Sequence, residues 1–469
     1  MRARPEVDVL VCGAGTAGAI AAIAAARTGA RTLLIEQSGR IGGMASTGMS
    51  FLGVSDGGGR RALGGIGAEA LDRLTASGAA FADRPDTQVG SVTAADPVAL
   101  QQVLLDMLLA AGVHLLLHAF CVDVLLDGHR VRGVVVADKA GLELVPSRAT
   151  VDATGDADIA ARSGARFVLG REIDGAMQPA TRIFRMAGVD VTAMLAYLRE
   201  HPEEMSLPER WQGGVDYGPR DLEAPSVVMD AFPTLVAEAR AAGVLTVPRD
   251  RIGIETGPVP GVVTINATRV HGTDGTDPDA LSRAEVETQR QMYEVAQFLR
   301  RRVPGFARSW LLDSSPRVGV RESRHVVGQY VLTLEDVLAG RDFPDTVARG
   351  AYPLDLHDLR PGAEVLGTRV GGHGVTLRRI ERAYGIPLRC LIPETVDALV
   401  VAGRAISASH EPAGSVRGQA VCMATGHAAG AIAAVSALAG VVPRRVDVGA
   451  VQRTLEEQHA ILFYANAPV

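Results

Sequence analysis

The stretch Val7-Asp-Val-Leu-Val-Cys-Gly-Ala-Gly-Thr-Ala-Gly18 decides the fold of this chain. Its first six residues have the apolar, β-branched character of a buried strand, and the alanine-rich residues 19–26 that follow favour a helix. Gly13 permits the tight turn between them, Gly15 lets backbone N–H groups approach a pyrophosphate, and Gly18 lets the helix pack closely on the strand. The sequence therefore predicts a dinucleotide-binding unit here.

A second strand is expected at residues 31–36, directly after this helix. It ends in Glu36, at the spacing where the acidic residue of a dinucleotide-binding unit accepts hydrogen bonds from the adenosine ribose. Glu36 therefore argues for a ribose without a phosphate.

Two further segments favour a flavin over a nicotinamide cofactor. Gln37-Ser-Gly-Arg-Ile-Gly-Gly-Met44 resembles the Arg-x-Gly-Gly continuation found in FAD-binding proteins of the glutathione-reductase type. A long dinucleotide needs such a second glycine loop, where backbone can pass close to the ribityl chain and the isoalloxazine ring. Val151-Asp-Ala-Thr-Gly-Asp156 resembles the Ala-Thr-Gly motif of the same superfamily. Together they imply FAD.

A third segment lies near the C-terminus. Asp397-Ala-Leu-Val-Val-Ala-Gly-Arg404 reads as a strand, and after a loop at 405–417 a long helix of small residues follows. This arrangement resembles the loop that brings a helix N-terminus against the flavin pyrimidine. The helix dipole there stabilises negative charge on reduced flavin.

The segments Val318-Gly-Val-Arg-Glu-Ser-Arg324 and Ser407-Ala-Ser-His-Glu411 resemble signatures of a bacterial FAD-dependent oxidoreductase family, and the resemblance extends from about residue 7 to 440. It implies an α/β fold, in which a Rossmann-like FAD-binding domain carries an inserted α+β substrate domain. The cofactor-binding residues implied are Gly13, Gly15, Thr16, Ala17, Gly18, Glu36, Gln37, Arg40, Gly42, Gly43, Met44, Val122, Ala153, Thr154, Gly155, Arg404, His410, Gly414, Ser415 and Val416.

Dinucleotide motifs at both ends predict a discontinuous domain plan. Residues 1–165 and 385–445 should form the FAD-binding domain, with the substrate domain at 166–384 between them and a C-terminal helix and tail at 446–469. The clearest helix of the substrate domain is expected at about 278–303, with Pro304 ending it.

Composition excludes several classes of protein. The net charge of −6 over 469 residues gives no basic surface for nucleic acid. The four cysteines are widely spaced and form neither a metal pair nor a redox pair. Residues 420–442 are apolar, but they consist largely of Ala and Gly, which favours a buried helix over a membrane span. No signal-peptide pattern begins the chain, so a cytoplasmic location is expected.

Candidate catalytic residues come from the middle of the chain. His271 follows an expected strand in a Gly/Asp-rich loop, where an imidazole could reach a substrate or simply cap the loop. Arg321, Glu322, Arg324 and His325 place four polar side chains in a valine-rich segment, which is costly unless they pair or bind something. Arg324 and His325 are the preferred substrate-facing pair, and an internal Arg–Glu network that braces the two domains is the alternative.

Other residues offer weaker candidates. Arg182 and Arg369, together with Arg321, could clamp an anionic group of the substrate. His410 could donate a proton beside the flavin or order the C-terminal loop, and the second role is favoured. Arg417 could orient the flavin or neutralise its reduced form.

The leading functional hypothesis is an FAD-dependent dehydrogenase or oxidase that transfers hydride between a small polar metabolite and flavin N5. Oxygen, a quinone or a partner protein would accept the electrons, and the sequence is compatible with a homo-oligomer. A reductase of an activated alkene and a flavoprotein subunit of a larger dehydrogenase complex remain alternatives. A monooxygenase is disfavoured, because Gly403-Arg404 replaces the superfamily's common Gly-Asp.

Overall fold

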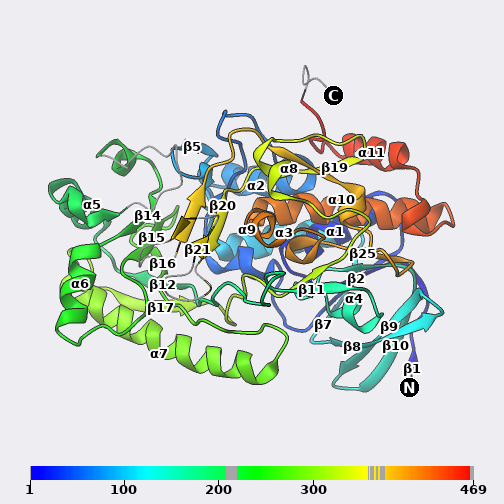
Figure 1. The fold of residues 1–469 in the computed structure, drawn as a ribbon, viewed down its shortest axis with the longest axis horizontal. Helices are drawn as coiled ribbons and strands as arrows, with labels where there is room; N and C mark the ends of the chain where they lie inside the picture. Colours follow the sequence, from blue (N-terminus) through cyan, green and yellow to red (C-terminus); the bar gives the residue numbers. More distant parts are fainter. Residues whose placement is uncertain are drawn as a thin grey trace.

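The computed structural model describes residues 2–206, 219–357, 359, 364–365, 368–369 and 375–464. Its largest sheet has eight strands (Figure 1). Six pair in the order β7 (His114–Leu117), β3 (Thr32–Glu36), β2 (Val7–Cys12), β10 (Gly141–Asp152), β9 (Arg130–Asp138) and β8 (Phe120–Asp127), while β1 (Arg2–Ala3) and β25 (Leu399–Val401) also pair with β10.

Strand β10 serves two parts of this sheet. Its residues 141–146 pair with β9 in antiparallel fashion, and its later residues pair in parallel with β2 and β25. Strands β7, β3, β2, β10 and β25 thus run parallel, and their carboxyl ends meet at one edge. This is the Rossmann-like core that the sequence predicts, with β25 contributed from the far end of the chain.

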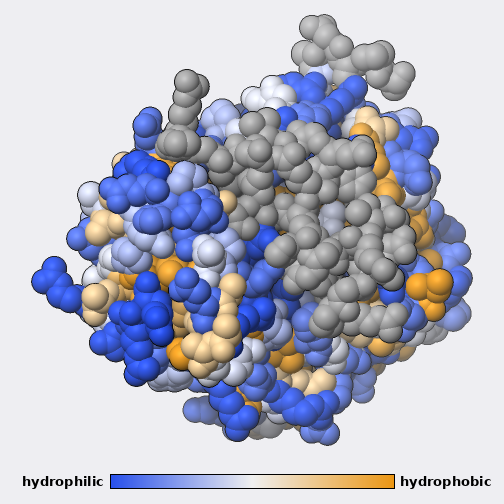
Figure 2. Space-filling view, turned by 60° about the vertical axis from the view of Figure 1, so that its left-hand side comes forward, coloured by the Kyte–Doolittle hydropathy of each residue, from blue (hydrophilic) through white to orange (hydrophobic). Residues whose placement is uncertain are grey.

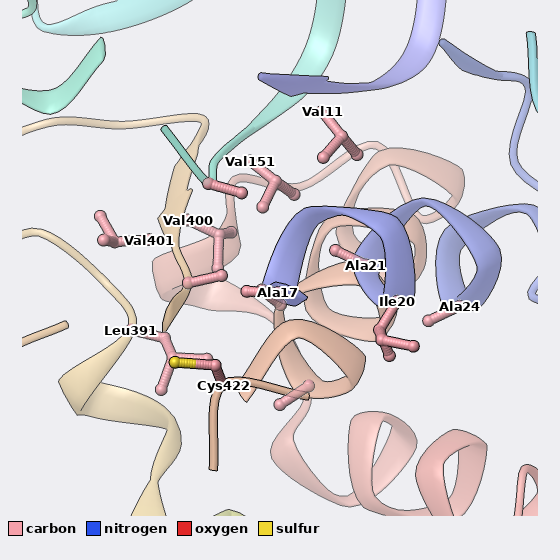
Figure 3. Packing of buried hydrophobic residues seen from close by; sticks show 14 of the residues in the cluster. Val11, Ala17, Ile20, Ala21, Ala24, Val151, Leu391, Val400, Val401 and Cys422 are labelled. Carbon is pink, nitrogen blue, oxygen red and sulfur yellow. The ribbon is translucent and has the colours of Figure 1, made fainter. Parts of the chain in front are cut away.

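Two helices of small residues cover the parallel strands. α1 (Thr16–Arg27) and α10 (Gln419–Leu438) lie against each other so closely that a Cβ on Gly426 would come within 2.2 Å of Ala17 O. Figure 3 shows side chains of β2, β10 and β25 gathered with those of α1. Among the described helices α10 is the one long and apolar enough to cross a membrane, yet 83% of its apolar window is buried inside the protein. The expected buried helix is confirmed.

A second, antiparallel sheet forms the inserted domain. Its strands pair in the order β13 (Met205–Ser206), β14 (Val228–Ala231), β15 (Ile252–Thr256), β16 (Val263–Asn266), β12 (Phe184–Ala187) and β17 (Trp310–Ser314). Helices α5 (Val191–Glu200), α6 (Pro233–Ala241) and α7 (Pro278–Arg302) belong to the same region (Figure 1). On the face that this domain presents in Figure 2, the described apolar residues are interspersed with hydrophilic ones.

Helix α7 fits its prediction closely. Asp277 caps it by accepting a hydrogen bond from the backbone N–H of Asp279, and Pro278 occupies the first turn, where a missing N–H costs nothing. The helix ends at Arg302, with Val303 as its C-cap before Pro304, and its apolar stripe packs into a core of its own with Phe184, Phe232 and Phe306.

This second core uses residues between 184 and 311. Several later side chains, among them Leu332, Phe343 and Tyr384, belong instead to the core of the FAD-binding domain. The boundaries at 165 and 384 stay a prediction.

The remaining described elements are shorter or flank these sheets. They are β4 (Phe51–Leu52), α2 (Gly65–Ala76), β5 (Arg84–Asp86), β6 (Gly90–Thr93), α3 (Pro97–Ala110), α4 (Asp158–Arg162), β11 (Phe167–Leu169), β18 (Arg324–Val326), α8 (Leu334–Leu338), β19 (Thr346–Gly350), β20 (Leu354–His357), β21 (Glu364–Val365), β22 (Thr368–Arg369), β23 (Val375–Arg378), β24 (Tyr384–Pro387), α9 (His410–Val416), α11 (Val448–Glu457) and six 3₁₀ turns.

Candidate active site

The three glycines of the first turn have different duties. Gly13 has φ +98°, and a Cβ there would lie 2.5 Å from Ala153 O, while a Cβ on Gly18 would lie 1.8 Å from Gly13 O. Gly15 differs, because a Cβ there would meet no heavy atom within 4 Å. No side chain caps the helix that begins after Gly15. The turn thus presents open space and unsatisfied N–H groups at a helix N-terminus, which fits a pyrophosphate.

Glu36 is buried beside this turn. One carboxylate oxygen accepts a hydrogen bond from Ala14 N at 2.8 Å, and the other accepts from Ser38 N and Oγ, both at 2.9 Å. These bonds tie the end of β3 to the turn. The proposed contact of Glu36 with a ribose stays a prediction.

The second glycine loop packs directly on the first. Gly42 N donates to Ala14 O at 2.8 Å, and Thr16 Oγ1 donates to Gly42 O at 3.1 Å. A Cβ on Gly43 would lie 2.8 Å from Gly15 Cα. The two loops therefore form one continuous backbone surface, suited to a ligand longer than a mononucleotide.

Asp156 links the Ala153–Thr154–Gly155 turn to two distant segments. Its Oδ1 accepts hydrogen bonds from Ser323 Oγ at 2.6 Å and from Arg404 NH2 at 2.5 Å. The arginine that replaces the superfamily's usual aspartate after Gly403 thus pairs with a carboxylate of the neighbouring turn. The hydrogen bond from Ser323 brings the Arg321–Arg324 segment to the carboxyl edge of the parallel sheet.

Helix α10 begins at this edge without a side-chain cap. Its N-cap, Gly418, fits against Tyr352, since a Cβ there would lie 2.3 Å from the ring. Ser415 of α9 accepts or donates a hydrogen bond with Tyr384 OH at 2.7 Å and donates to Tyr352 O at 2.5 Å. These contacts hold the positive end of α10 in a fixed position, and its predicted approach to the flavin stays a prediction.

A buried carboxylate joins two histidines next to α10. Glu322 Oε1 lies 2.7 Å from His410 Nδ1 and 3.0 Å from His325 Nε2, and its other oxygen accepts from Gln178 N at 3.1 Å. Burial alone would raise the pKa of Glu322, but the hydrogen bonds from the two histidines lower it to about 2. Burial disfavours a charged His410, yet its bond to Glu322 raises the pKa of that imidazole.

The tautomer of His410 follows from this geometry. An ionised carboxylate can only accept, so Nδ1 of His410 donates. Nε2 is then the nitrogen through which the ring can take up or release a proton. Glu322, His325 and His410 therefore form an acid–base group, which we name the Glu322 group.

A second buried cluster is rich in arginine. Arg417 NH2 donates to Asp355 Oδ2 at 2.8 Å, and Tyr352 OH donates to the same oxygen at 2.7 Å. His357 Nε2 lies 3.3 Å from Asp355 Oδ1, while its Nδ1 accepts from Arg269 NH2 at 3.1 Å. Burial and the charge of Arg321 hold the pKa of His357 well below its usual range, so this ring is neutral.

Residues 8–455 match the sequence pattern of the family described as FAD dependent oxidoreductase. The chain belongs to this family. FAD is therefore its cofactor, and the protein is an FAD-dependent enzyme. The first glycine loop fits that cofactor, because Gly15 faces open space at the uncapped N-terminus of α1, where a pyrophosphate can bind.

None of the curated proteins compared with the chain matches it. Similar solved structures include a geranylgeranyl bacteriochlorophyll reductase-like protein from Thermoplasma acidophilum, with TM-score 0.46, 11% identity, and 97% of this chain and 84% of that chain covered. A flavin-dependent brominase variant has TM-score 0.46 at 14% identity, covering 96% and 84%. A p-nitrophenol 4-monooxygenase from Pseudomonas putida has TM-score 0.43 at 13% identity, covering 98% and 84%. Likenesses this distant carry no argument about the reaction.

The predicted catalytic residues Arg324 and His325 contact different groups in the structure. His325 belongs to the Glu322 group, whereas Arg324 donates to Asp156 O and Asp158 Oδ1, both at 2.9 Å. These contacts favour the bracing alternative for Arg324. Its predicted contact with a substrate is not tested by them.

His271 lines a surface groove of about 590 Å³ between the 270–273 loop and α7. Its Nε2 has no hydrogen-bond partner among the described residues. Burial and the charges of Arg269 and Arg321 lower the pKa of His271 to about 4. The ring is therefore neutral near pH 7.

The predicted anion clamps also differ. Arg182 is buried and donates to Ser315 O at 2.7 Å, to Thr288 Oγ1 at 3.2 Å and to Glu285, so that its guanidinium braces α7. The backbone of Arg369 lies in β22, but its side chain lies outside the described residues. Arg321 is discussed below.

Sequence reasoning did not single out Gln178, Asp355 or His357. Asp355 and His357 alternate along β20, so both polar side chains point to one face of a buried strand. That alternation, in Tyr-Pro-Leu-Asp-Leu-His at residues 352–357, is a signal that could have found them.

Proposed function

We propose that this enzyme is a dehydrogenase or oxidase that transfers a hydride from a small polar metabolite to flavin. The observation that carries the proposal is the Glu322 group, in which one buried carboxylate orients His410 at the start of α9. Removing a hydride from a C–H bond next to oxygen or nitrogen also requires a base for the O–H or N–H proton. His410 Nε2 supplies that base.

The steps balance as follows. Bound FAD supplies the two-electron acceptor, at N5 of its ring. His410 Nε2 takes the proton of the substrate O–H or N–H while the C–H bond breaks with both electrons, and a C=O or C=N bond forms. Glu322 stabilises the resulting imidazolium, since its carboxylate lies 2.7 Å from Nδ1. His325 bonds to the same oxygen of Glu322 and helps to hold it in place.

The opposite direction is a second candidate, favoured by the raised pKa of His410. A histidine whose protonated form is stabilised by a carboxylate can donate its proton to the carbon next to the one that receives hydride, as reduction of an activated alkene requires. The same residues would serve both directions.

The test begins with the absorption spectrum of the purified protein and anaerobic addition of small alcohols, hydroxy acids and amines. We expect one class to bleach the oxidised flavin. If none does, the flavin is reduced with dithionite, activated alkenes are added, and reoxidation of the flavin is followed. Reoxidation by an alkene would support the second candidate. Flavin that responds to neither panel would overturn the proposal and favour a subunit of a larger dehydrogenase complex.

A further inference from the structure

Arg321 is a buried cation without a matching anion. It is 9% exposed, its NH1 donates to Pro179 O at 2.6 Å, and no carboxylate of a described residue lies within ion-pair distance of it. Burial and the nearby charge of Arg417 hold its pKa well below the usual range, and Asp355 offsets this only in part. Because a guanidinium keeps its proton in proteins, such burial is costly until an anion arrives.

Asp355, the carboxylate whose charge acts on Arg321, is already hydrogen-bonded to other groups. Asp355 accepts from Arg417 NH2 and Tyr352 OH, and His357 faces its other oxygen. Arg417 Nε has no hydrogen-bond partner among the described residues. The single negative charge of Asp355 therefore lies near two buried guanidinium groups, Arg321 and Arg417. Both guanidinium groups keep N–H groups that could donate to a ligand.

Gln178 supplies a further donor between the arginine cluster and the Glu322 group. It is 1% exposed, and its Oε1 accepts from His357 N at 3.1 Å while its own N–H donates to Glu322. Its Nε2 has no partner among the described residues. A buried amide donor left unsatisfied costs about 1–3 kcal/mol, so a ligand acceptor would be stabilised here.

A surface groove lies close to the cluster. His271 lines the 590 Å³ groove, and the charges of Arg269 and Arg321 act on the same ring. Arg283 and Arg290 line the groove farther out on α7. The approach thus carries positive charge, which attracts anions toward the cluster.

We propose that the substrate carries a carboxylate, and that Arg321 and Arg417, together with Gln178 Nε2, bind this carboxylate next to the bond on which His410 acts. The guanidinium fork matches a carboxylate in shape and charge, and an amide donor adds a third hydrogen bond. This inference rests on the proposed function and narrows its substrate to small organic acids, such as hydroxy or amino acids.

The negative N1/O2 edge of reduced flavin offers the same anionic chemistry, so the test must separate it from a substrate carboxylate. The holoenzyme is titrated with malonate, and with the uncharged malonamide as the matched probe, while the oxidised flavin spectrum is recorded. We expect saturable binding of malonate and binding of malonamide at least tenfold weaker. Equal binding of the two probes would overturn the inference.

Variants then locate the site. Arg321→Lys, which keeps the charge but loses the fork, should weaken malonate binding at least tenfold. Arg349→Lys is the control, because Arg349 is equally buried and donates to two carbonyl oxygens but has Asp342 as its counter-charge. It should leave malonate binding unchanged. If Arg321→Lys does not fold, Gln178→Glu replaces it, since a carboxylate there should repel malonate.

The flavin potential separates the two anions. If Arg321→Lys shifts the reduction potential but leaves malonate binding intact, Arg321 serves the flavin and the inference fails. The inference and the proposed function can also fail separately. If malonate binding depends on Arg321 but no organic acid reduces the flavin, the carboxylate site stands and only the proposed reaction is wrong. If uncharged substrates reduce the flavin and malonate does not compete with them, the proposed reaction stands and only the carboxylate site is wrong.

Discussion

The proposed FAD cradle and the proposed substrate side of this enzyme are built in opposite ways. The FAD cradle is made mostly of backbone, from Gly13–Gly18 and Gly42–Gly43, and each of its glycine loops is continuous in sequence. The substrate side is made of side chains from segments far apart, at 178, 269–271, 321–325, 355–357 and 410–417. Backbone sites leave a local signature of glycines, whereas side-chain sites appear only when the fold brings their members together.

The largest expected effect lies within the cradle. Gly18→Ala should prevent folding or FAD binding, because its Cβ would lie 1.8 Å from Gly13 O. An extra carbon in a well-packed core lowers the stability of the folded protein by about 1–3 kcal/mol or more. Gly15→Ala should fold with an unchanged melting temperature but lose FAD, since its Cβ fills only the open cradle. Flavin absorbance and thermal unfolding measure both. Equal thermal stability of the two FAD-free variants would break the distinction between structural and ligand-facing glycines.

The next effect concerns the substrate side. Glu322→Gln should keep FAD but lower the rate of flavin reduction by about 10²-fold or more, because the imidazolium of His410 loses its counter-charge. Glu322 raises the pKa of His410, so its removal should also move the rising limb of the pH–rate profile to lower pH. Stopped-flow reduction across pH checks this. If the rising limb of the pH–rate profile stays at the same pH, His410 is not the base that controls the rate.

A smaller effect is expected at His271. His271→Ala should keep the flavin and slow its reduction by about tenfold, equivalent to roughly 1.4 kcal/mol of added activation free energy. Because the pKa of His271 is about 4, the variant should leave the pH profile above pH 5 unchanged in shape. Reduction at the wild-type rate would remove His271 from the substrate site.

A separate effect, which leaves the reaction unchanged, should appear in stability. Glu255 of β15 accepts a hydrogen bond from Ser50 N at 2.6 Å, and burial raises its pKa to about 7. A raised carboxyl pKa favours the folded state below the unfolded pKa of 4.5, and this advantage is lost as pH rises toward 7. Glu255→Gln should therefore stabilise the protein near pH 8, by up to about 3 kcal/mol, and have little effect near pH 4. Thermal melts at both pH values test this, and equal shifts would contradict it.

The sequence predicts the cradle well for a physical reason. Gly13, Gly15 and Gly18 are required by local backbone geometry, and the strand, turn and helix around them are confirmed at Val7–Cys12 and Thr16–Arg27. The long helix of the insert is likewise confirmed, because its cap, its proline and its stripe are all local.

The partners of individual charges could not be predicted in this way. Arg321 and Arg324 are three positions apart, yet Arg324 pairs with Asp158 while Arg321 lies in the arginine cluster. Glu322 finds His410 across 88 positions of sequence. Such choices depend on how β18, β20 and the α9–α10 loop meet, which no local pattern encodes.

The most direct test of the account is the single-turnover rate of flavin reduction in His410→Gln, compared with the wild type at equal flavin occupancy. The account predicts the same flavin content and melting temperature with a rate lowered by about 10²- to 10⁴-fold, the usual contribution of a general base. A rate equal to that of the wild type would contradict it.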